Sequence, residues 1–343
     1  MNISEWPSDD LEYLGCCPVC GSESRELQYA DLKDKLYAVS GTWSFHRCMD
    51  CKVCYLDPRP NIETIGRTYS TYHTHGPVNP KNIPNNALIQ VKLAIKNGCL
   101  NSIWKTSFQP ASPLLAQLIL KLYPGWLAMY RRQTMRDLPI PACGELLDIG
   151  CGSGTFLQLA KAVGWSVQGI DFDEKAINVA RANNIDVKLG GIALFDGKKE
   201  LFDVITLSHV VEHVHDPRML LKACWRLLKP GGVFWIESPN YDSYGRKLFG
   251  ANWRGLEAPR HLVIFNTANM ARLLAEIGFS NIQHAEWMPQ LKPMFQASKN
   301  IKNGNSPDAN NLNIFEKVKI VVTDIRSRTN INDREYLTFT CKK

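Results

Sequence analysis

The stretch Glu145-Leu-Leu-Asp-Ile-Gly-Cys-Gly-Ser-Gly-Thr155 decides the fold of this chain of 343 residues. Its first five residues predict a short buried strand, and its last residue is expected to begin a helix. Between them, Gly150, Gly152 and Gly154 let the backbone turn sharply and approach a ligand closely, because glycine has no Cβ. The helix that follows points unpaired N–H groups at whatever occupies the turn. The pattern therefore predicts a ligand-binding turn between a strand and a helix.

Two acidic residues accompany the glycine turn. Asp148 precedes it, and Asp171 lies 23 residues further on, at the end of a second predicted strand, Ser166 to Ile170. A carboxylate at that place can accept hydrogen bonds from both hydroxyls of a ribose. The glycine spacing differs from the Gly-x-Gly-x-x-Gly pattern of dinucleotide-binding proteins, so it does not point to a dinucleotide.

Further blocks follow the turn, namely Gly169-Ile-Asp-Phe-Asp173, Phe202-Asp-Val-Ile-Thr206, Val211-Glu-His-Val-His-Asp-Pro217 and Leu227-Leu-Lys-Pro-Gly-Gly232. Over roughly residues 140–290 and the final strand, the chain resembles the class I S-adenosylmethionine-dependent methyltransferases. The resemblance implies that S-adenosylmethionine is bound by Asp148, Gly150, Gly152, Gly154, Asp171, Phe172 and Ser208.

Predicted strands and helices alternate regularly between residues 145 and 287, which predicts an α/β fold with a parallel sheet and helices on both faces. The resemblance implies a Rossmann-like, seven-stranded methyltransferase sheet whose last strand, near 336–341, is antiparallel. We expect this domain to span residues 139–343. Residues 288–313 are rich in Asn, Lys, Ser and Pro, and are expected to form a mobile loop.

Two cysteine pairs lie near the N-terminus, Cys17-Pro-Val-Cys20 and Cys48-Met-Asp-Cys51. Four thiolates complete the tetrahedral coordination of zinc, so the expected site is structural. Six of the eleven cysteines fall between Cys16 and Cys54, which favours metal over disulfides, in a reducing compartment. Residues 1–60 resemble the zinc-binding segment ahead of some sugar and natural-product methyltransferases, and we expect a zinc-ribbon-like module. The alternative is a set of buried free cysteines.

The chain carries a net charge of +7, but no acidic residue lies between Glu63 and Asp137, where nine Lys and Arg residues occur. One interpretation is a helical connector, residues 61–138, that packs on the catalytic domain. The other is that residues 64–136 contact an anionic membrane or an acidic, lipid-linked substrate. RNA would also fit the charge, but the segment contains no recognised RNA-binding module, so a nucleic-acid partner is not expected.

The segment 208–215 holds three of the eight histidines. Histidine titrates near neutral pH, so His213 is the candidate general base, with Glu212 orienting it and His261 as the alternative base. The segment is similar to the Glu-x-x-Glu-His of ubiquinone-biosynthesis O-methyltransferases, where these side chains are associated with a divalent metal. Here His209 replaces the first glutamate, which removes a hard oxygen ligand, so a catalytic metal is not expected.

A long polar and aromatic loop follows, and its residues Arg246, Arg254 and Arg260 together would suit a phosphate or carboxylate. The combined prediction is a methyltransferase acting on a small-molecule, sugar or lipid-linked glycan acceptor. An RNA methyltransferase and a non-catalytic cofactor-binding module remain the alternatives. No transmembrane run or signal peptide is recognisable, so we expect a cytoplasmic protein, with the inner face of the membrane as the other location. The oligomeric state stays open.

Overall fold

The computed structural model of the chain describes residues 5–70, 87–122, 124–138, 144–306 and 309–343. The chain divides into two compact units. One combines Met1–His73, Leu207–Arg226 and Ile236–Lys343, and the other combines Thr74–Thr206 and Leu227–Trp235. The domain boundaries expected after residues 60 and 138 stay predictions.

The glycine-rich stretch forms the strand–turn–helix unit that the sequence predicts. Its successive elements are β6 (Glu145–Ile149), α4 (Thr155–Val163), β7 (Ser166–Asp171), α5 (Glu174–Ala182) and β8 (Val187–Leu189). The three strands are parallel, with Asp148 opposite Gly169 and Asp171 opposite Leu189. The carboxyl ends of these strands therefore meet at one edge, where ligands of parallel sheets bind.

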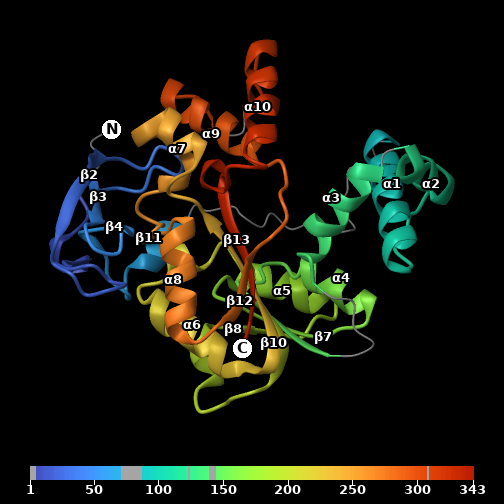
Figure 1. The fold of residues 1–343 in the computed structure, drawn as a ribbon, viewed down its shortest axis with the longest axis horizontal. Helices are drawn as coiled ribbons and strands as arrows, with labels where there is room; N and C mark the ends of the chain where they lie inside the picture. Colours follow the sequence, from blue (N-terminus) through green and yellow to red (C-terminus); the bar gives the residue numbers. More distant parts are fainter. Residues whose placement is uncertain (1–4, 71–86, 123, 139–143, 307–308) are drawn as a thin grey trace. The chain divides into compact units, whose positions relative to one another are not determined.

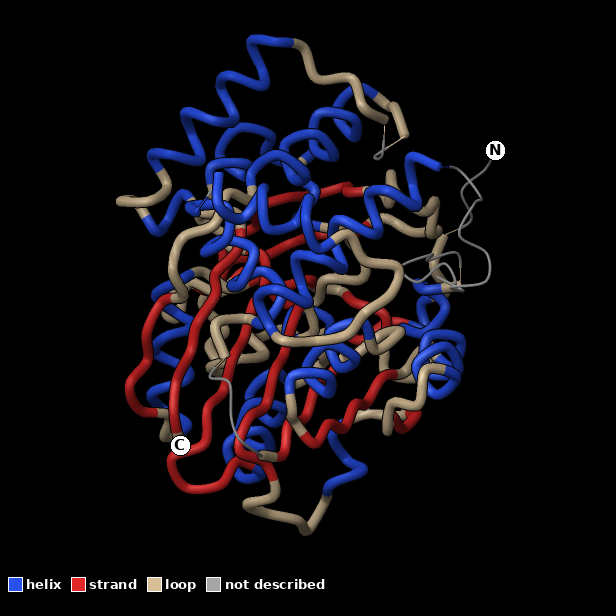
Figure 2. Tube along the Cα trace, turned by 90° about the vertical axis from the view of Figure 1, so that its right-hand side faces the viewer, coloured by secondary structure: helices blue, strands red, loops and turns tan. Residues whose placement is uncertain are grey.

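These strands belong to a seven-stranded mixed sheet, which confirms the predicted α/β methyltransferase fold. Its order is β12-β13-β10-β9-β6-β7-β8, and Figure 2 shows its neighbouring strands running side by side. The additional strands are β9 (Phe202–Ser208), β10 (Leu228–Pro239), β12 (Ser280–His284) and β13 (Tyr336–Lys342). The pairing of β12 with β13 is antiparallel. Helices α6 (Pro217–Leu227) and α8 (Thr267–Ile277) lie where the sequence predicts them.

The acid-free segment is helical in its described part. It forms α1 (Ala87–Trp104), α2 (Pro113–Leu122) and α3 (Pro124–Met135), and Figure 1 shows α1 and α2 side by side. A Cβ at Gly98 would lie 2.6 Å from the carbonyl oxygen of Ser112, so glycine there permits this close approach. Leu100 and Met135 share a hydrophobic cluster with Leu146 of β6, which anchors the helices within their own unit.

A second sheet has the order β11-β4-β3-β2, and of the paired cysteines Cys48 ends β3, while Cys17 and Cys20 precede β2 and Cys51 lies between β3 and β4. This sheet contains β2 (Arg25–Leu32), β3 (Trp43–Cys48), β4 (Cys54–Leu56) and β11 (Val263–Ile264). Strands β2, β3 and β4 lie next to one another in Figure 1. Beside them, β1 (Leu11–Glu12) pairs with β5 (Arg59–Pro60). Strand β11 comes from far along the chain, so residues 1–60 do not complete this sheet alone.

The expectation of a loop over residues 288–313 is wrong for much of its length, because α9 spans Leu291–Asn303. Apolar residues of α9 recur on one face, and Leu291 and Phe295 are buried in a cluster with Ile320. Lys292, Lys302 and Asn303 are exposed, whereas Asn300 is fully buried, so the polar composition of this segment does not exclude a packed helix. Helix α10 (Ile314–Arg326) follows it, and α7 (Tyr244–Phe249) lies within the predicted polar loop.

None of the helices in the described part of the chain combines the length and the apolarity needed to cross a bilayer.

Candidate active site

The three glycines of the turn have backbone conformations that side chains rarely allow. Their φ angles are 73° at Gly150, 52° at Gly152 and 73° at Gly154, all in the left-handed region. Asp171 ties the end of β7 to this turn, because its Oδ2 accepts a hydrogen bond from the backbone N–H of Gly152 at 2.8 Å. Its Oδ1 accepts one from the N–H of Asp173, also at 2.8 Å. The structure thus brings the predicted glycines and Asp171 together.

Phe172 presents an aromatic ring to solvent beside this turn, with the residue 79% exposed. The ring lies close to the backbone at Gly191, where a Cβ would be 2.6 Å from its Cζ. Glycine at 191 therefore leaves room for the ring, whose outer surface is free to stack on a flat ligand group.

Asp148 is almost fully buried. Its Oδ1 accepts hydrogen bonds from Thr206 Oγ1 at 2.7 Å and from Arg136 Nη1 at 2.6 Å. The Arg136 guanidinium also lies 3.8 Å from the ring centroid of Phe156, the second residue of α4. In the sequence, Arg136 stands out only as one of the basic residues of the acid-free segment. No short motif indicates that it pairs with Asp148.

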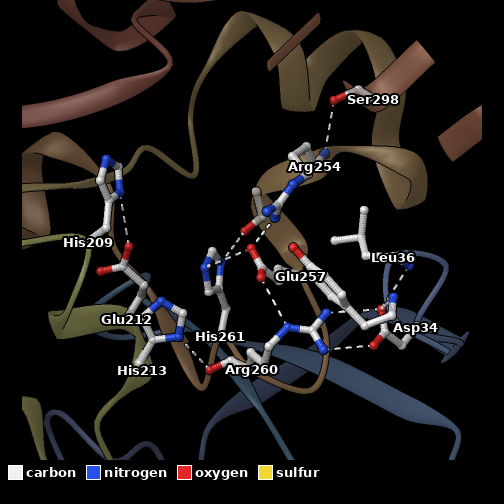
Figure 3. A network of polar contacts seen from close by, with 12 residues as sticks. Asp34, Leu36, His209, Glu212, His213, Arg254, Glu257, Arg260, His261 and Ser298 are labelled. Atoms are coloured by element: carbon white, nitrogen blue, oxygen red, sulfur yellow. Dashed lines mark hydrogen bonds and ion pairs between the residues drawn. The ribbon is translucent and has the colours of Figure 1, made fainter. Parts of the chain in front are cut away.

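The His-rich segment belongs to the other compact unit, together with Ser208 at the end of β9. Glu212 is fully buried, and Figure 3 shows its carboxylate directed at His209, with Oε1 3.3 Å from His209 Nδ1. Its Oε2 accepts a hydrogen bond from Ser238 Oγ at 3.1 Å. Burial alone would raise the pKa of Glu212, but the hydrogen bond and the charge from His209 outweigh burial and lower this pKa to about 2. Glu212 is therefore a buried carboxylate at neutral pH.

His213 is oriented by a backbone carbonyl. Its Nδ1 lies 3.0 Å from the carbonyl oxygen of Arg260 and 3.0 Å from Tyr69 Oη. Because a carbonyl only accepts, Nδ1 carries the proton, and Nε2 of the neutral ring keeps its lone pair. Such an imidazole can take a proton or bind a metal through Nε2.

His261 is held in the same way, with Nδ1 donating to the carbonyl oxygen of Gly255 at 2.8 Å. Its ring centroid lies 4.7 Å from that of His213, and its Nε2 is 3.5 Å from Glu257 Oε2. Burial lowers the pKa of His261 to about 4, so this ring is neutral at pH 7. Glu212, His213 and His261 each offer a ligand atom, and these atoms lie within 4.8 Å of one another.

The arginines of the preceding loop do not form the predicted anion site. Arg260 is fully buried and binds Asp34 through two bonds, at 2.7 and 3.0 Å. Its Nε also donates to Glu257 Oε1 at 3.0 Å, and Glu257 in turn pairs with Arg254. These contacts, visible in Figure 3, join the loop to the turn before β3, where Asp34 lies. Arg260 is therefore a structural residue, while Arg246 lies over the Tyr241 ring.

The four predicted metal ligands come together as a cluster. The Sγ atoms of Cys17, Cys20, Cys48 and Cys51 lie within 4.8 Å of one another, with Cys17–Cys51 and Cys20–Cys48 separations of 3.5 Å. A zinc tetrahedron with Zn–S bonds of about 2.3 Å has edges of about 3.8 Å. The donor set and its spacing therefore fit zinc.

A cavity of about 300 Å³ adjoins this network within the same unit. It is lined by residues 30–36 at the end of β2, by residues 251–254 and 256–258 of the polar loop, and by Ile301 of α9. Glu257 connects the two features, since it lines the cavity and also contacts His261.

A family profile described as a methyltransferase domain matches residues 126–284. Ubiquinone biosynthesis O-methyltransferase from Thiobacillus denitrificans is 34% identical over 159 residues, which are 41% of this chain and 67% of that protein. The protein of the same name from Pseudomonas entomophila is 34% identical over 118 residues, which are 32% of this chain and 51% of that protein. A solved S-adenosylmethionine-dependent methyltransferase from Archaeoglobus fulgidus has a TM-score of 0.43 at 22% identity, covering 71% of this chain and 97% of that one.

The matched residues contain the glycine turn, Asp171 and the His-rich segment. The match spans two thirds of the first relative and about half of the second. On the family profile and these relatives, the chain belongs to the class I S-adenosylmethionine-dependent methyltransferases.

Proposed function

We propose that this enzyme transfers a methyl group from S-adenosylmethionine to a small-molecule, sugar or lipid-linked glycan acceptor, with His213 as general base. The hydrogen bond from His213 Nδ1 to the Arg260 carbonyl carries the proposal, because it leaves Nε2 able to accept a proton. Methyl transfer from a sulfonium is an in-line displacement, and a hydroxyl or carbon acid must lose a proton as it attacks. The buried carboxylate of Glu212 then stabilises the imidazolium that forms.

The cofactor would bind at the glycine turn and supply an electrophilic methyl group. Asp171 would accept hydrogen bonds from the ribose hydroxyls, and the exposed ring of Phe172 would stack on the adenine. One observation supports the fit: Gly191 leaves room for the Phe172 ring, and the ring itself stays exposed. Gly150 and Gly152 would let the backbone approach the methionine part, and Ser208 is a further predicted contact. Asp148 would act indirectly, by holding Arg136.

A part of the acceptor remote from its reacting group would bind in the cavity beside Glu257, since His213 is not among the residues that line this cavity. A volume of about 300 Å³ lies at the small end of known ligand pockets, which favours a sugar or another small group over a polymer. Trp253 and Leu36 supply apolar lining, while Lys33 and Lys35 supply positive charge. The lining also contains Asp31, Asp34 and Glu257, which balance Lys33, Lys35 and Arg254, so a hydroxyl-rich sugar matches it better than a phosphate.

The four cysteines would hold one structural zinc ion. Four thiolates leave no open coordination position, so the ion would stabilise the β2–β4 sheet rather than act on substrate. Because β11 pairs with β4, and His261 lies two residues before β11, the ion would also stabilise the position of this histidine.

A lipid-linked acceptor would bring the enzyme to a membrane, and the acid-free segment supports this location. Leu114, Leu118 and Leu122 recur at helical spacing on α2, and all three are more than half exposed. Lys92 and Lys96 of α1 and Lys121 of α2 are exposed as well, and this combination of apolar and basic side chains would suit anionic lipid.

The substitution His213→Gln tests the base. With methyl-labelled S-adenosylmethionine and host-cell extract, label transfer should fall by about 10²–10⁴-fold, because a positioned base contributes that much to proton transfer. Cofactor affinity, measured by calorimetry, should stay unchanged. The matched control is His215→Gln in the same segment, whose ring bonds to the carbonyl of Pro60 instead. Near-normal label transfer by the His213 variant would rule out this histidine as the base.

A metal-assisted reaction is the second candidate, favoured by the Glu212–His213–His261 ligand set. The base proposal predicts one metal equivalent per chain, held by the cysteines. A second equivalent that disappears in a His261→Ala variant would replace the base proposal with metal-assisted chemistry.

A further inference from the structure

Helix α10 exposes an unusually apolar face. Six of its residues are between 42% and 81% exposed: Ile314, Phe315, Val318, Val321, Val322 and Ile325. At 3.6 residues per turn, these positions fall within about 120° of the helix circumference. A single exposed apolar side chain is ordinary, but a continuous face of this kind marks an interaction surface.

The face belongs to a helix that is firmly held from its other side. Ile320 is buried against Leu291 and Phe295 of α9, which lies beside α10 in Figure 1. Asp324 is also buried, and its Oδ1 accepts the backbone N–H of Leu291 at 3.1 Å and that of Gln290 at 3.2 Å. The fold therefore orients α10 so that Ile320 and Asp324 face α9 and the six apolar residues face solvent.

The charges around the apolar face are positive. Lys317 lies on one flank, and Lys319 and Arg326 lie on the other, all three exposed. The two acids of α10 are neutralised or turned away, since Glu316 pairs with Lys299 at 2.8 Å and Asp324 faces α9. An apolar strip flanked by long basic side chains is the arrangement of helices that lie in a membrane interface.

We infer that α10 docks this enzyme on the surface of an anionic lipid bilayer. The six apolar side chains would enter the boundary between headgroups and acyl chains, while Lys317, Lys319 and Arg326 reach the lipid phosphates. Packing against α10 of a second copy fits less well, because the basic flanks of the two helices would face one another. The inference does not depend on the acceptor, since bilayer binding and methyl transfer are measured separately.

The test uses the full-length protein and sedimentation with vesicles of phosphatidylcholine, with or without one quarter phosphatidylglycerol. Wild-type protein should bind the anionic vesicles, and binding should weaken at high salt. Val318→Glu/Val321→Glu should reduce the partition coefficient by at least about tenfold, because two acids replace apolar contacts. Lys317→Glu/Lys319→Glu should act similarly on anionic vesicles. Matched controls are Met219→Glu, at an exposed apolar position of α6, and Lys222→Glu on the same helix.

Hydrogen exchange supplies a second measurement that does not depend on the variants. Peptides covering residues 314–326 should exchange more slowly when anionic vesicles are present. Unchanged vesicle binding by the α10 variants, or absence of binding by the wild type, would overturn the inference. A concentration-dependent dimer that the Val318→Glu/Val321→Glu variant abolishes would also overturn it, because α10 would then be a protein interface.

Discussion

At the scale of single residues, His209 connects two carboxylates. Its Nδ1 lies 3.3 Å from Glu212 Oε1, and its Nε2 lies 3.4 Å from Glu237 Oε1. Burial opposes protonation of the ring, but these two carboxylates outweigh it and raise the pKa of His209 to about 10. The protonated His209 ring thus lies between Glu212 and Glu237, at a position where the similar metal-associated motif has a glutamate. Its positive charge can neutralise the two carboxylates without a metal ion.

Replacing His209 by Asn should destabilise the protein in a pH-dependent way. Asn tolerates the left-handed φ of 54° at this position, so the substitution removes the charge without straining the backbone. We expect the free energy of unfolding to fall by about 1–3 kcal/mol near pH 6, the lower value allowing for water screening at a side chain that is 40% exposed.

The sign of the pH dependence follows from the raised pKa. The stabilisation by His209 is complete below its unfolded pKa of about 6.5, and it is lost as pH rises through about 10. The contribution of Glu212 has the opposite form, since its lowered pKa makes it complete above about 4.5 and lost toward pH 2. Urea unfolding of the wild type and the His209→Asn variant between pH 5 and pH 10 measures the difference in their free energies of unfolding, which should shrink as pH rises. His284→Asn is a control whose pH dependence should have the opposite sign, because burial lowers the pKa of His284 and protonation of this ring opposes folding.

At the scale of elements, the cysteine sheet positions the proposed acceptor chemistry. Strand β11 pairs with β4, with Val263 opposite Tyr55. The residue just before β11, Leu262, donates its backbone N–H to the carbonyl of Glu212 at 2.7 Å and accepts one from Leu56 at 2.9 Å. His261 and Glu212 are therefore linked through the backbone to β4, and any loosening of this sheet should move them.

Cys48→Ser should consequently impair methyl transfer to the acceptor and leave cofactor binding nearly unchanged. We expect zinc content, measured by plasma mass spectrometry, to fall from one equivalent to below half, and label transfer to fall by more than about tenfold. Cofactor affinity should change by less than about threefold, because the glycine turn and Asp171 belong to the other compact unit, which has its own hydrophobic cluster. Cys16→Ser is the matched control, since Cys16 lies outside the cluster. Normal transfer by a zinc-free Cys48 variant would contradict this role of the sheet.

At the scale of the whole molecule, the predicted cofactor contacts and the proposed acceptor chemistry fall largely into different units. The glycine turn, Asp171 and Phe172 belong to one, while the His-rich segment and the cavity belong to the other. Each unit also carries its own exposed surface of basic and apolar residues, on α2 in one and on α10 in the other. Both surfaces agree with the proposed lipid-linked acceptor, which would itself be at a membrane.

The distribution of transferred label among the fractions of a cell extract should reflect a lipid-linked acceptor. After incubation of enzyme, methyl-labelled cofactor and host-cell extract, we expect most enzyme-dependent label in the lipid fraction, with the His213→Gln protein as the parallel control. Label confined to the aqueous small-molecule fraction would identify a free sugar or metabolite and contradict a lipid-linked acceptor. Label in nucleic acid would favour the RNA alternative. Cofactor binding without any label would favour the non-catalytic alternative.

The sequence by itself determined the fold class and the cysteine cluster, because both rest on local patterns. The glycine turn imposes its left-handed backbone within a few residues, and the Cys pairs carry their own spacing. The alternation of apolar strands with amphipathic helices likewise needs no distant partner, so the boundaries of β6 and α4 match the prediction.

Only the tertiary structure decided which polar side chains meet. Arg260 and Asp34 are 226 positions apart, and no periodicity encodes their pairing, so the sequence grouped Arg260 with Arg246 and Arg254 as possible anion ligands and missed its buried partner. Likewise, Arg136 gains its role only because Asp148 is buried beside it, and a buried carboxylate requires a partner. The inward face of α9 became recognisable only with Ile320 of α10 packed against it. Local patterns determine elements, whereas burial brings distant charges together, and burial is a property of the folded chain.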